Sequence, residues 1–176
     1  YALYVTPEED INEKREISAQ KYLNTLNFIN SAARKIWTED IVNAGKKRGL
    51  KFGEHWQQKN IMEGPLPAVF FRYTGSLLKK SSNPQVSVYL SSEYPINPSN
   101  KISGEFLTDY NKVVRSRKSI YQYSPHDNVY YAMYPDIASS KACVTCHNKH
   151  SDSPRNDWKL NDVMGASFWL IKSNEI

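Results

Sequence analysis

The sequence predicts an α+β fold in which helices precede a small antiparallel sheet. Residues 1–50 carry the apolar period of a helix, whereas short alternating segments gather in the second half of the chain. No regular succession of strand, helix and parallel strand runs along the chain, so a doubly wound sheet is not expected. With 176 residues and no internal repeat, the chain is expected to form a single domain over residues 1–176.

The composition is that of an ordered protein rather than a disordered or membrane-embedded one. Hydrophobic residues make up 40% of the chain and charged residues 23%, and the mean hydropathy is -0.64. No run approaches the roughly 18 apolar residues that a spanning helix needs. The chain begins at Tyr1 without a signal-peptide pattern, and we expect it to be a piece of a longer protein.

The net charge of +5 and the pI near 9.1 do not by themselves indicate a nucleic-acid partner. Basic residues occur in short groups such as Lys46-Lys47-Arg48, Lys79-Lys80 and Arg115-Ser116-Arg117-Lys118. Aromatic residues do not interleave with a long basic run, as they would on a surface that binds nucleic acid. A solvated basic surface is therefore expected, and no nucleic acid.

The first fifty residues are predicted to form one long helix. Thr6 is a suitable N-cap, and Glu9 three residues later completes a capping box. The predicted apolar stripe consists of Tyr22, Leu26, Ile29, Ala33 and Ile36. Gly45 and Gly49 are two positions at which the helix could end. Because this helix is longer than a domain of this size requires, it either frays at its far end or serves as a stalk or dimerisation helix.

The middle of the chain is predicted to alternate between helix and extended structure. A second helix is expected over 66–80. Its buried face is expected to hold Val69 or Phe70, Tyr73 and Leu77. A strand follows at 86–90, and two prolines make 94–100 a rigid loop. Residues 106–113 are predicted to form a third helix.

Three further strands are predicted in the last third of the chain. Residues 119–123 and 128–134 are predicted to be paired strands on either side of the turn signal at 124–127, which indicates a hairpin. Residues 163–171 are predicted to form the last strand. These strands complete a small antiparallel sheet.

The two cysteines of the chain lie in the motif Cys143-Val144-Thr145-Cys146-His147. This C-x-x-C-H spacing is that of c-type haem attachment. Two thiols add to the two vinyl groups of a porphyrin, the two intervening residues set their separation, and the next imidazole binds the iron. The sequence therefore predicts one covalent haem c per chain on Cys143 and Cys146, with His147 as the proximal ligand.

Other roles for the two cysteines remain open from the residues alone. A redox dithiol would be expected near a βαβ unit, which this part of the chain lacks, and a disulfide across two residues would be small and strained. Zinc bound by Cys143, Cys146 and His150 would need a fourth ligand, and no second cysteine pair supplies one. The architectures of small electron-carrying cytochromes and of cytochrome c′ do not fit, since the motif is late in the chain and Pro154 prevents a long helix after it.

Residues 142–165 resemble the haem-binding end of a family of PAS-like haem-c sensor domains. The family pattern there is CV-x-CHN-x-H, then SP-K/R-x-DWK, then G-D-V-x-G. The chain departs from it once, at Asn161, where the family usually has glycine in a turn. Upstream, 65–70 is similar to the family's PLPATF helix start, 94–100 to its P-x-NP-x-N loop, and 34–42 to its R-x-YY-x-x-x-VV helix.

The resemblance covers about residues 15–171 and implies a PAS-like antiparallel sheet flanked by helices. The PAS-like core would then be 65–171, with the haem at 143–147 held against the sheet. The resemblance also implies a periplasmic or otherwise extracytoplasmic location and a membrane-anchored parent protein. An extracytoplasmic location agrees with covalent haem attachment, which takes place outside the cytoplasm.

The distal side of the iron is the least determined part of the predicted site. Met133, on the strand that leads to the motif, offers a thioether, and Tyr130 and Tyr131 are candidates to face the ring. An open position or a bound water is an equal alternative to Met133. The other candidates for the distal ligand are His55, His126, Met62 and Met164.

Residues around the last strand are candidates for the periphery of the haem. Arg155 and Lys159 are close enough in sequence to pair with the propionates, although a solvated surface suits both equally well. Trp158 and Phe168 are candidates to pack on the porphyrin. His150 is expected to be a hydrogen-bonded structural residue.

The motif and the resemblance together predict a haem sensor of redox state or of a small gas such as nitric oxide or carbon monoxide. A change at the iron would shift the strands of the distal side against the long helix, which is also the expected homodimer contact. The alternative is a monohaem c-type cytochrome that exchanges electrons with a redox partner. No catalysis is expected, because nothing in the spacing selects a distal acid–base group.

Overall fold

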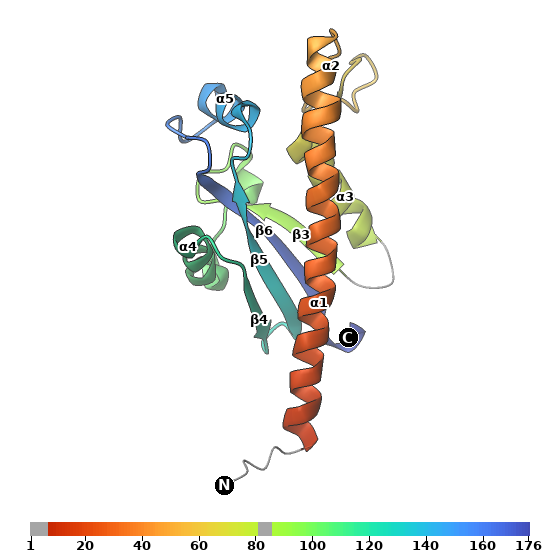
Figure 1. The fold of residues 1–176 in the computed structure, drawn as a ribbon, viewed down its shortest axis with the longest axis vertical. Coiled ribbons are helices and arrows are strands. Elements are labelled where there is room, and N and C mark those ends of the chain that lie inside the picture. Colours follow the sequence, from red (N-terminus) through yellow and green to blue (C-terminus); the bar gives the residue numbers. More distant parts are fainter. Residues whose placement is uncertain (1–6, 81–85) are drawn as a thin grey trace.

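One long helix dominates the N-terminal part of the chain in the computed structural model, which describes residues 7–80 and 86–176. It consists of α1 (Pro7–Ile36), the π-helical segment η1 (Trp37–Asn43) and α2 (Ala44–Lys47), which follow one another directly (Figure 1). The long helix is thus confirmed, although it ends before the predicted residue 50. The predicted N-cap Thr6 lies outside the described residues.

The long helix ends at a glycine for a conformational reason. Gly49 follows the C-cap Arg48 and has a left-handed φ of 87°, which glycine adopts without strain. Gly45, the other predicted stop, lies inside the helix instead. A Cβ atom at Gly45 would lie 2.9 Å from the ring of Phe52, so the glycine allows this ring to approach the helix.

Four antiparallel strands form the central sheet. They are β3 (Val86–Ser91), β4 (Ile120–Ser124), β5 (Val129–Ile137) and β6 (Val163–Lys172). Their spatial order is β3-β6-β5-β4, so the last strand of the chain lies inside the sheet. The four predicted strands are confirmed, and with them the α+β class.

The remaining elements connect and cover the sheet. They are β1 (Phe52–Gly53), β2 (Gly64–Pro65), α3 (Pro67–Lys80), η2 (Pro98–Asn100), η3 (Gly104–Phe106), α4 (Leu107–Ser116), α5 (Lys141–Lys149) and η4 (Ser173–Glu175). The predicted second and third helices correspond to α3 and α4. Within residues 7–80 and 86–176, no helix has the length and apolar character needed to cross a bilayer.

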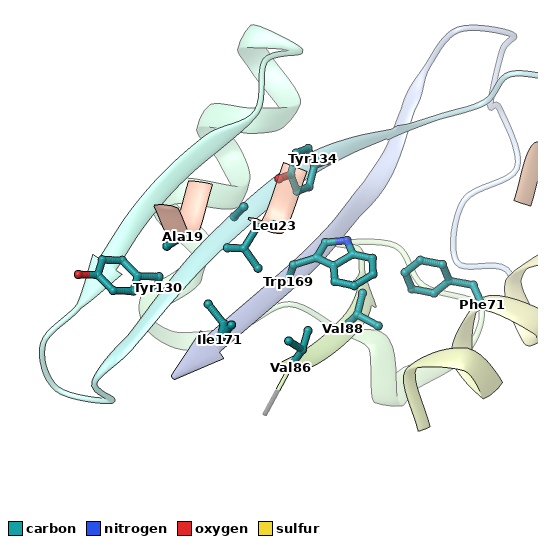
Figure 2. Packing of buried hydrophobic residues seen from close by; sticks show 10 residues of the cluster. Ala19, Leu23, Phe71, Val86, Val88, Tyr130, Tyr134, Trp169 and Ile171 are labelled. Carbon is teal, nitrogen blue, oxygen red and sulfur yellow. The ribbon is translucent and has the colours of Figure 1, made fainter. Parts of the chain in front are cut away.

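The sheet is covered on both faces, because successive residues of a strand point to opposite sides. One face packs against α1 and α3 through Ala19, Leu23, Phe71, Val86, Val88, Tyr130, Ala132, Tyr134, Trp169 and Ile171 (Figure 2). The other face packs against α4 through Ile102, Tyr110, Val113, Tyr131, Met133, Ala166 and Phe168. We call these the α1-side core and the α4-side core.

The predicted apolar faces of the first two helices are wrong in part. On α1, Ile29 and Ile36 are 59% and 55% exposed, whereas Ala19 and Leu23 are buried against the sheet. On α3, the predicted Tyr73 and Leu77 are exposed, and the buried residues are Val69, Phe71 and Gly75. On α1 the error arises because polar residues make much of the contact with the sheet.

These polar contacts of α1 come from Asn24 and Asn27, which with the buried Asn30 form what we call the polar seam. The Oδ1 atom of Asn24 accepts hydrogen bonds from the hydroxyls of Tyr121 (2.7 Å) and Tyr134 (3.1 Å). The Oδ1 atom of Asn27 accepts from the Ser167 hydroxyl (3.0 Å) and the Trp169 indole N–H (3.2 Å). Asn30 is buried beyond them on the same helix. The helix is therefore positioned by directional bonds as well as by apolar packing.

Candidate functional site

The C-x-x-C-H motif lies on α5, a helix that begins directly after Ser140. The Ser140 hydroxyl accepts a hydrogen bond from the backbone N–H of Cys143 at 3.3 Å, which caps the helix. The same hydroxyl lies 3.1 Å from the Cys143 sulfur. No helix is predicted here from the apolar period, because this segment of nine residues is short and mostly exposed. The N-cap serine is the sequence signal that would have revealed it.

The two cysteines stand about one turn apart on α5, so they occupy neighbouring positions of the helix surface. Cys143 is half-buried, Cys146 is exposed, and both are free thiols. His147 follows immediately on the same helix. This arrangement is compatible with the attachment of haem c, since two accessible thiols and an adjacent imidazole are the groups that it requires.

The imidazole of His147 is half-buried, and its Nδ1 atom has no hydrogen-bond partner among the described residues. Desolvation lowers the pKa of His147, and His150 adds to this effect, although the carboxylate of Asp136 acts in the opposite direction. Burial thus favours the neutral form of the ring, which is the form that a metal ligand needs. A buried ring nitrogen without a partner also fits a site whose bound group is not part of the polypeptide.

Asn148, the residue after His147, fastens the motif to the segment that precedes β6. Its side-chain amide donates to the carbonyl oxygen of Trp158, and its Oδ1 atom accepts from the Trp158 N–H, both at 2.9 Å. A third, smaller apolar cluster surrounds this clamp. It contains Ala138, Trp158 and Met164, with Cys143 and Val144 packed against it. Trp158 also has a buried indole N–H without a partner among the described residues.

An ion pair connects the end of β5, just before the motif, to the long helix. The guanidinium of Arg34 on α1 lies 3.1 and 3.5 Å from the two carboxylate oxygens of Asp136. The same guanidinium lies 5.1 Å from the centre of the Phe71 ring. Asp136 is the charged residue that acts on His147, so the pair places α1 in electrostatic contact with the motif.

The other end of α5 contacts the loop that follows the long helix. The Nε2 atom of His150 lies 3.6 Å from a carboxylate oxygen of Glu54, and its Nδ1 atom accepts a hydrogen bond from the Asp152 N–H at 3.2 Å. His150 is thus tied to two neighbouring segments. The role predicted for it, a hydrogen-bonded structural residue, agrees with these contacts.

The predicted propionate partners lie on the segment that Asn148 clamps. The guanidinium of Arg155 stacks 4.0 Å from the Trp158 ring centre, and its Nε atom donates to Asp157 at 2.6 Å. The bond to Asp157 raises the pKa of Arg155. Lys159 is exposed and follows the same tryptophan. Of the predicted peripheral residues, Trp158, Arg155 and Lys159 are therefore gathered beside α5.

The structure does not bring Tyr130, Tyr131 and Met133 together at the motif. Tyr130 belongs to the α1-side core, whereas Tyr131 and Met133 belong to the α4-side core on the opposite face of the sheet. The Tyr131 hydroxyl donates to Asp109 at 2.7 Å, and Met133 is fully buried. Phe168 also lies in the α4-side core, so none of these four residues packs against Cys143.

The remaining distal candidates are scattered over the molecule. Met164 is buried in the third cluster, beside Cys143. His126 is exposed in the turn between β4 and β5, 3.0 Å from Asp127. His55 and Met62 are exposed in the segment between β1 and β2. Met164 is thus the one predicted candidate in this group that the structure places next to the motif.

The zinc alternative gains no support from the donor arrangement. In the described parts of the chain, no three or more histidine, cysteine, aspartate or glutamate side chains are grouped so that they could hold a metal ion. The site offers two thiols and one neutral imidazole, with clamped aromatic and apolar neighbours. This donor set fits a group bound through both thiols better than a bare ion.

The comparison with known families gave a match that covers most of the chain. A family model described as Tll0287-like matches residues 5–171. The matched range contains the long helix, the whole sheet up to Ile171, and the motif on α5. No curated protein and no solved structure showed a significant match to this chain.

Proposed function

The chain belongs to the Tll0287-like family, and from this premise we propose that it is the haem-c input domain of an extracytoplasmic sensor. One haem is attached to Cys143 and Cys146, and His147 is the proximal iron ligand. When bound, this group supplies one-electron redox chemistry and an iron site for a small gas such as nitric oxide or carbon monoxide. Any catalytic output lies on a domain outside this chain.

The observation that carries the proposal is the set of groups on α5. Two free thiols stand one turn apart, and burial lowers the pKa of the neighbouring imidazole, which has a buried nitrogen without a partner among the described residues. Trp158 and Arg155, clamped beside them, supply an aromatic wall and a cation for the edge of the haem.

The path from the site to an output passes through Asp136 and Arg34. This pair joins the strand end next to His147 to the long helix, directly before the π-helical segment Trp37–Asn43. Such π-helical segments are often found at functional sites, because they relax the regular helix geometry. A change in charge or ligation at the iron would therefore act first on this part of the helix.

The exposed stripe of the long helix supports a homodimer. Phe28, Ile29 and Ile36 are 74%, 59% and 55% exposed on one helix. Exposed apolar groups of this size usually indicate a contact with another surface. A second copy of the chain, in a membrane-anchored parent protein outside the cytoplasm, is the partner that we propose for this stripe.

The experiment that tests this function is spectroscopy on chain matured with a c-type haem assembly system. The pyridine haemochrome should show one c-type haem per chain, and the C143S/C146S variant should carry no covalent haem. Ferrous protein should then change its spectrum on addition of nitric oxide or carbon monoxide, or change its hydrogen exchange on α1 between oxidation states. Colourless matured protein would refute the proposal, and a haem without either response would reduce it to electron transfer.

A further inference from the structure

The end of the long helix carries a concentrated positive charge. Residues 44–63, which we call the basic tip, contain five lysine or arginine residues and two glutamates, and so account for +3 of the net charge of +5. The five basic residues are Lys46, Lys47, Arg48, Lys51 and Lys59. All five are exposed, and none has an ion-pair partner within residues 7–80 and 86–176.

The basic tip is folded, so these charges are carried on a fixed surface. The backbone N–H of Leu50 donates to the carbonyl oxygen of Gly45 at 2.9 Å, and that of Gly64 donates to the carbonyl oxygen of Lys51 at 2.9 Å. These bonds fold the segment back on itself. The parallel pairing of β1 with β2 closes the loop of residues 54–63 within the tip. Two apolar side chains of the basic tip are also exposed, Leu50 by 59% and Met62 by 94%. An apolar centre with a charged rim is typical of a protein contact surface.

The basic tip is also adjacent to the motif. Glu54 of the tip lies 3.6 Å from His150 on α5, and Lys46 is close enough to act electrostatically on the thiol of Cys146. Figure 1 shows α2 and α5 at the same end of the molecule, away from both chain termini. A carrier that docks on the tip would therefore stand beside the helix that holds the haem.

We propose that the basic tip is the docking surface for an acidic electron-carrying protein that exchanges single electrons with the haem. This inference rests on the proposed haem attachment. One electron passes from the reduced carrier to ferric haem, or from ferrous haem to the oxidised carrier, and no bond forms or breaks. An acidic protein fits better than an anionic membrane, because the tip meets the motif and includes Glu54 and Glu63, which a negative bilayer would repel.

The test uses small redox probes of opposite charge with the ferrous holoprotein. Stopped-flow oxidation by ferricyanide, an anion, should be fast at low salt and slow down as salt is added, because screening weakens the attraction. The K46E/K47E/R48E variant should lower this rate about tenfold at low salt. The same variant should raise the rate with the cation tris(phenanthroline)cobalt(III).

A matched control separates the position of the charge from its total. The K79E/K80E/K172E variant changes the net charge equally, on exposed lysines of α3 and β6 outside the tip. Its rates with both probes should stay within about twofold of those of the unchanged chain. Equal effects of the two triple variants would overturn the inference and leave the haem intact. The inference would also be overturned if the basic tip bound phosphatidylglycerol vesicles but its substitution had no effect on electron transfer. Absence of haem would overturn both proposals.

Discussion

Asn148 shows how one side chain holds two separate parts of the candidate site together. It makes two hydrogen bonds with the backbone of Trp158, ten residues further along the chain. We expect N148A to lower the free energy of unfolding by about 1–3 kcal/mol, because it leaves a buried N–H and carbonyl unpaired. Urea unfolding measures this change. The exposed Asn156 provides the control, and N156A should change stability by less than about 0.5 kcal/mol. Equal stabilities of N148A and N156A would refute the clamp.

Asp109 gives the α4-side core a dependence on pH. Burial raises its pKa, but hydrogen bonds from Lys112 and Tyr131 outweigh burial and hold the pKa below its ordinary value. The stability gained from this group is therefore complete above the ordinary pKa of about 4 and is lost as the pH falls through the lower value of the folded state. We expect the free energy of unfolding of D109N to be well below that of the unchanged chain at pH 6. The difference between the two free energies should narrow towards pH 2. A difference in unfolding free energy that stays the same from pH 6 to pH 2 would contradict the lowered pKa of Asp109.

At the residue scale, the sequence locates the motif but not its contacts. The C-x-x-C-H spacing identifies Cys143, Cys146 and His147 because it is a local pattern that one short helix can present. The partners Arg34 and Asp136 are 102 residues apart, so no local pattern connects them. Tyr130 and Tyr131 were grouped by nearness in sequence, whereas strand alternation sends them to opposite faces.

Moving to the scale of elements, the ion pair between α1 and the end of β5 is open to a direct test in protein that carries the proposed haem. We expect R34M to lower the midpoint potential, because the unpaired Asp136 carboxylate near His147 would stabilise the ferric form. Spectroelectrochemical titration measures this shift. The R34M/D136N double variant removes both charges and should return close to the original potential. A potential that rises in R34M would rule out the proposed electrostatic link.

The exposed stripe of α1 makes a second prediction at this scale. If the stripe forms a homodimer, I29E/I36E should shift the chain towards the monomer in sedimentation equilibrium, because charges at the contact oppose burial. The control is Y73E/L77E on α3, which adds the same charge at two exposed positions outside the stripe. A chain that is monomeric at millimolar concentration before any substitution would exclude this contact.

The elements that could be predicted are those whose burial follows a simple period. The strands of the sheet show alternation, and residues 129–134 are buried on both faces, which makes an apolar run. Helix α5 has no apolar stripe and was missed. The predicted stripe of α1 is wrong in part, because Asn24 and Asn27 replace apolar residues at the sheet. A hydrophobic period cannot reveal a contact that is made by amides and hydroxyls.

Considering the whole molecule, the motif and the core beneath α4 belong to separate clusters of side chains. Met133 lies in that core with no exposed surface. We expect M133L to leave the ferric and ferrous haem spectra unchanged, whereas M133A should lower the free energy of unfolding by about 2–5 kcal/mol through the cavity it leaves. Absorption spectra and urea unfolding of the two variants test this separation. Loss of a low-spin ligand band in M133L would instead identify Met133 as the distal ligand.

The polar seam also affects how the long helix can move along the sheet. Asn24, Asn27 and Asn30 recur every three residues, which corresponds to an axial step of about 4.5 Å. The amides of Asn24 and Asn27 meet tyrosine and serine hydroxyls and an indole N–H only when the helix has one position along the sheet. A displacement of the helix by less than this step would leave these polar groups unpaired, so the seam opposes small shifts of α1 along the sheet.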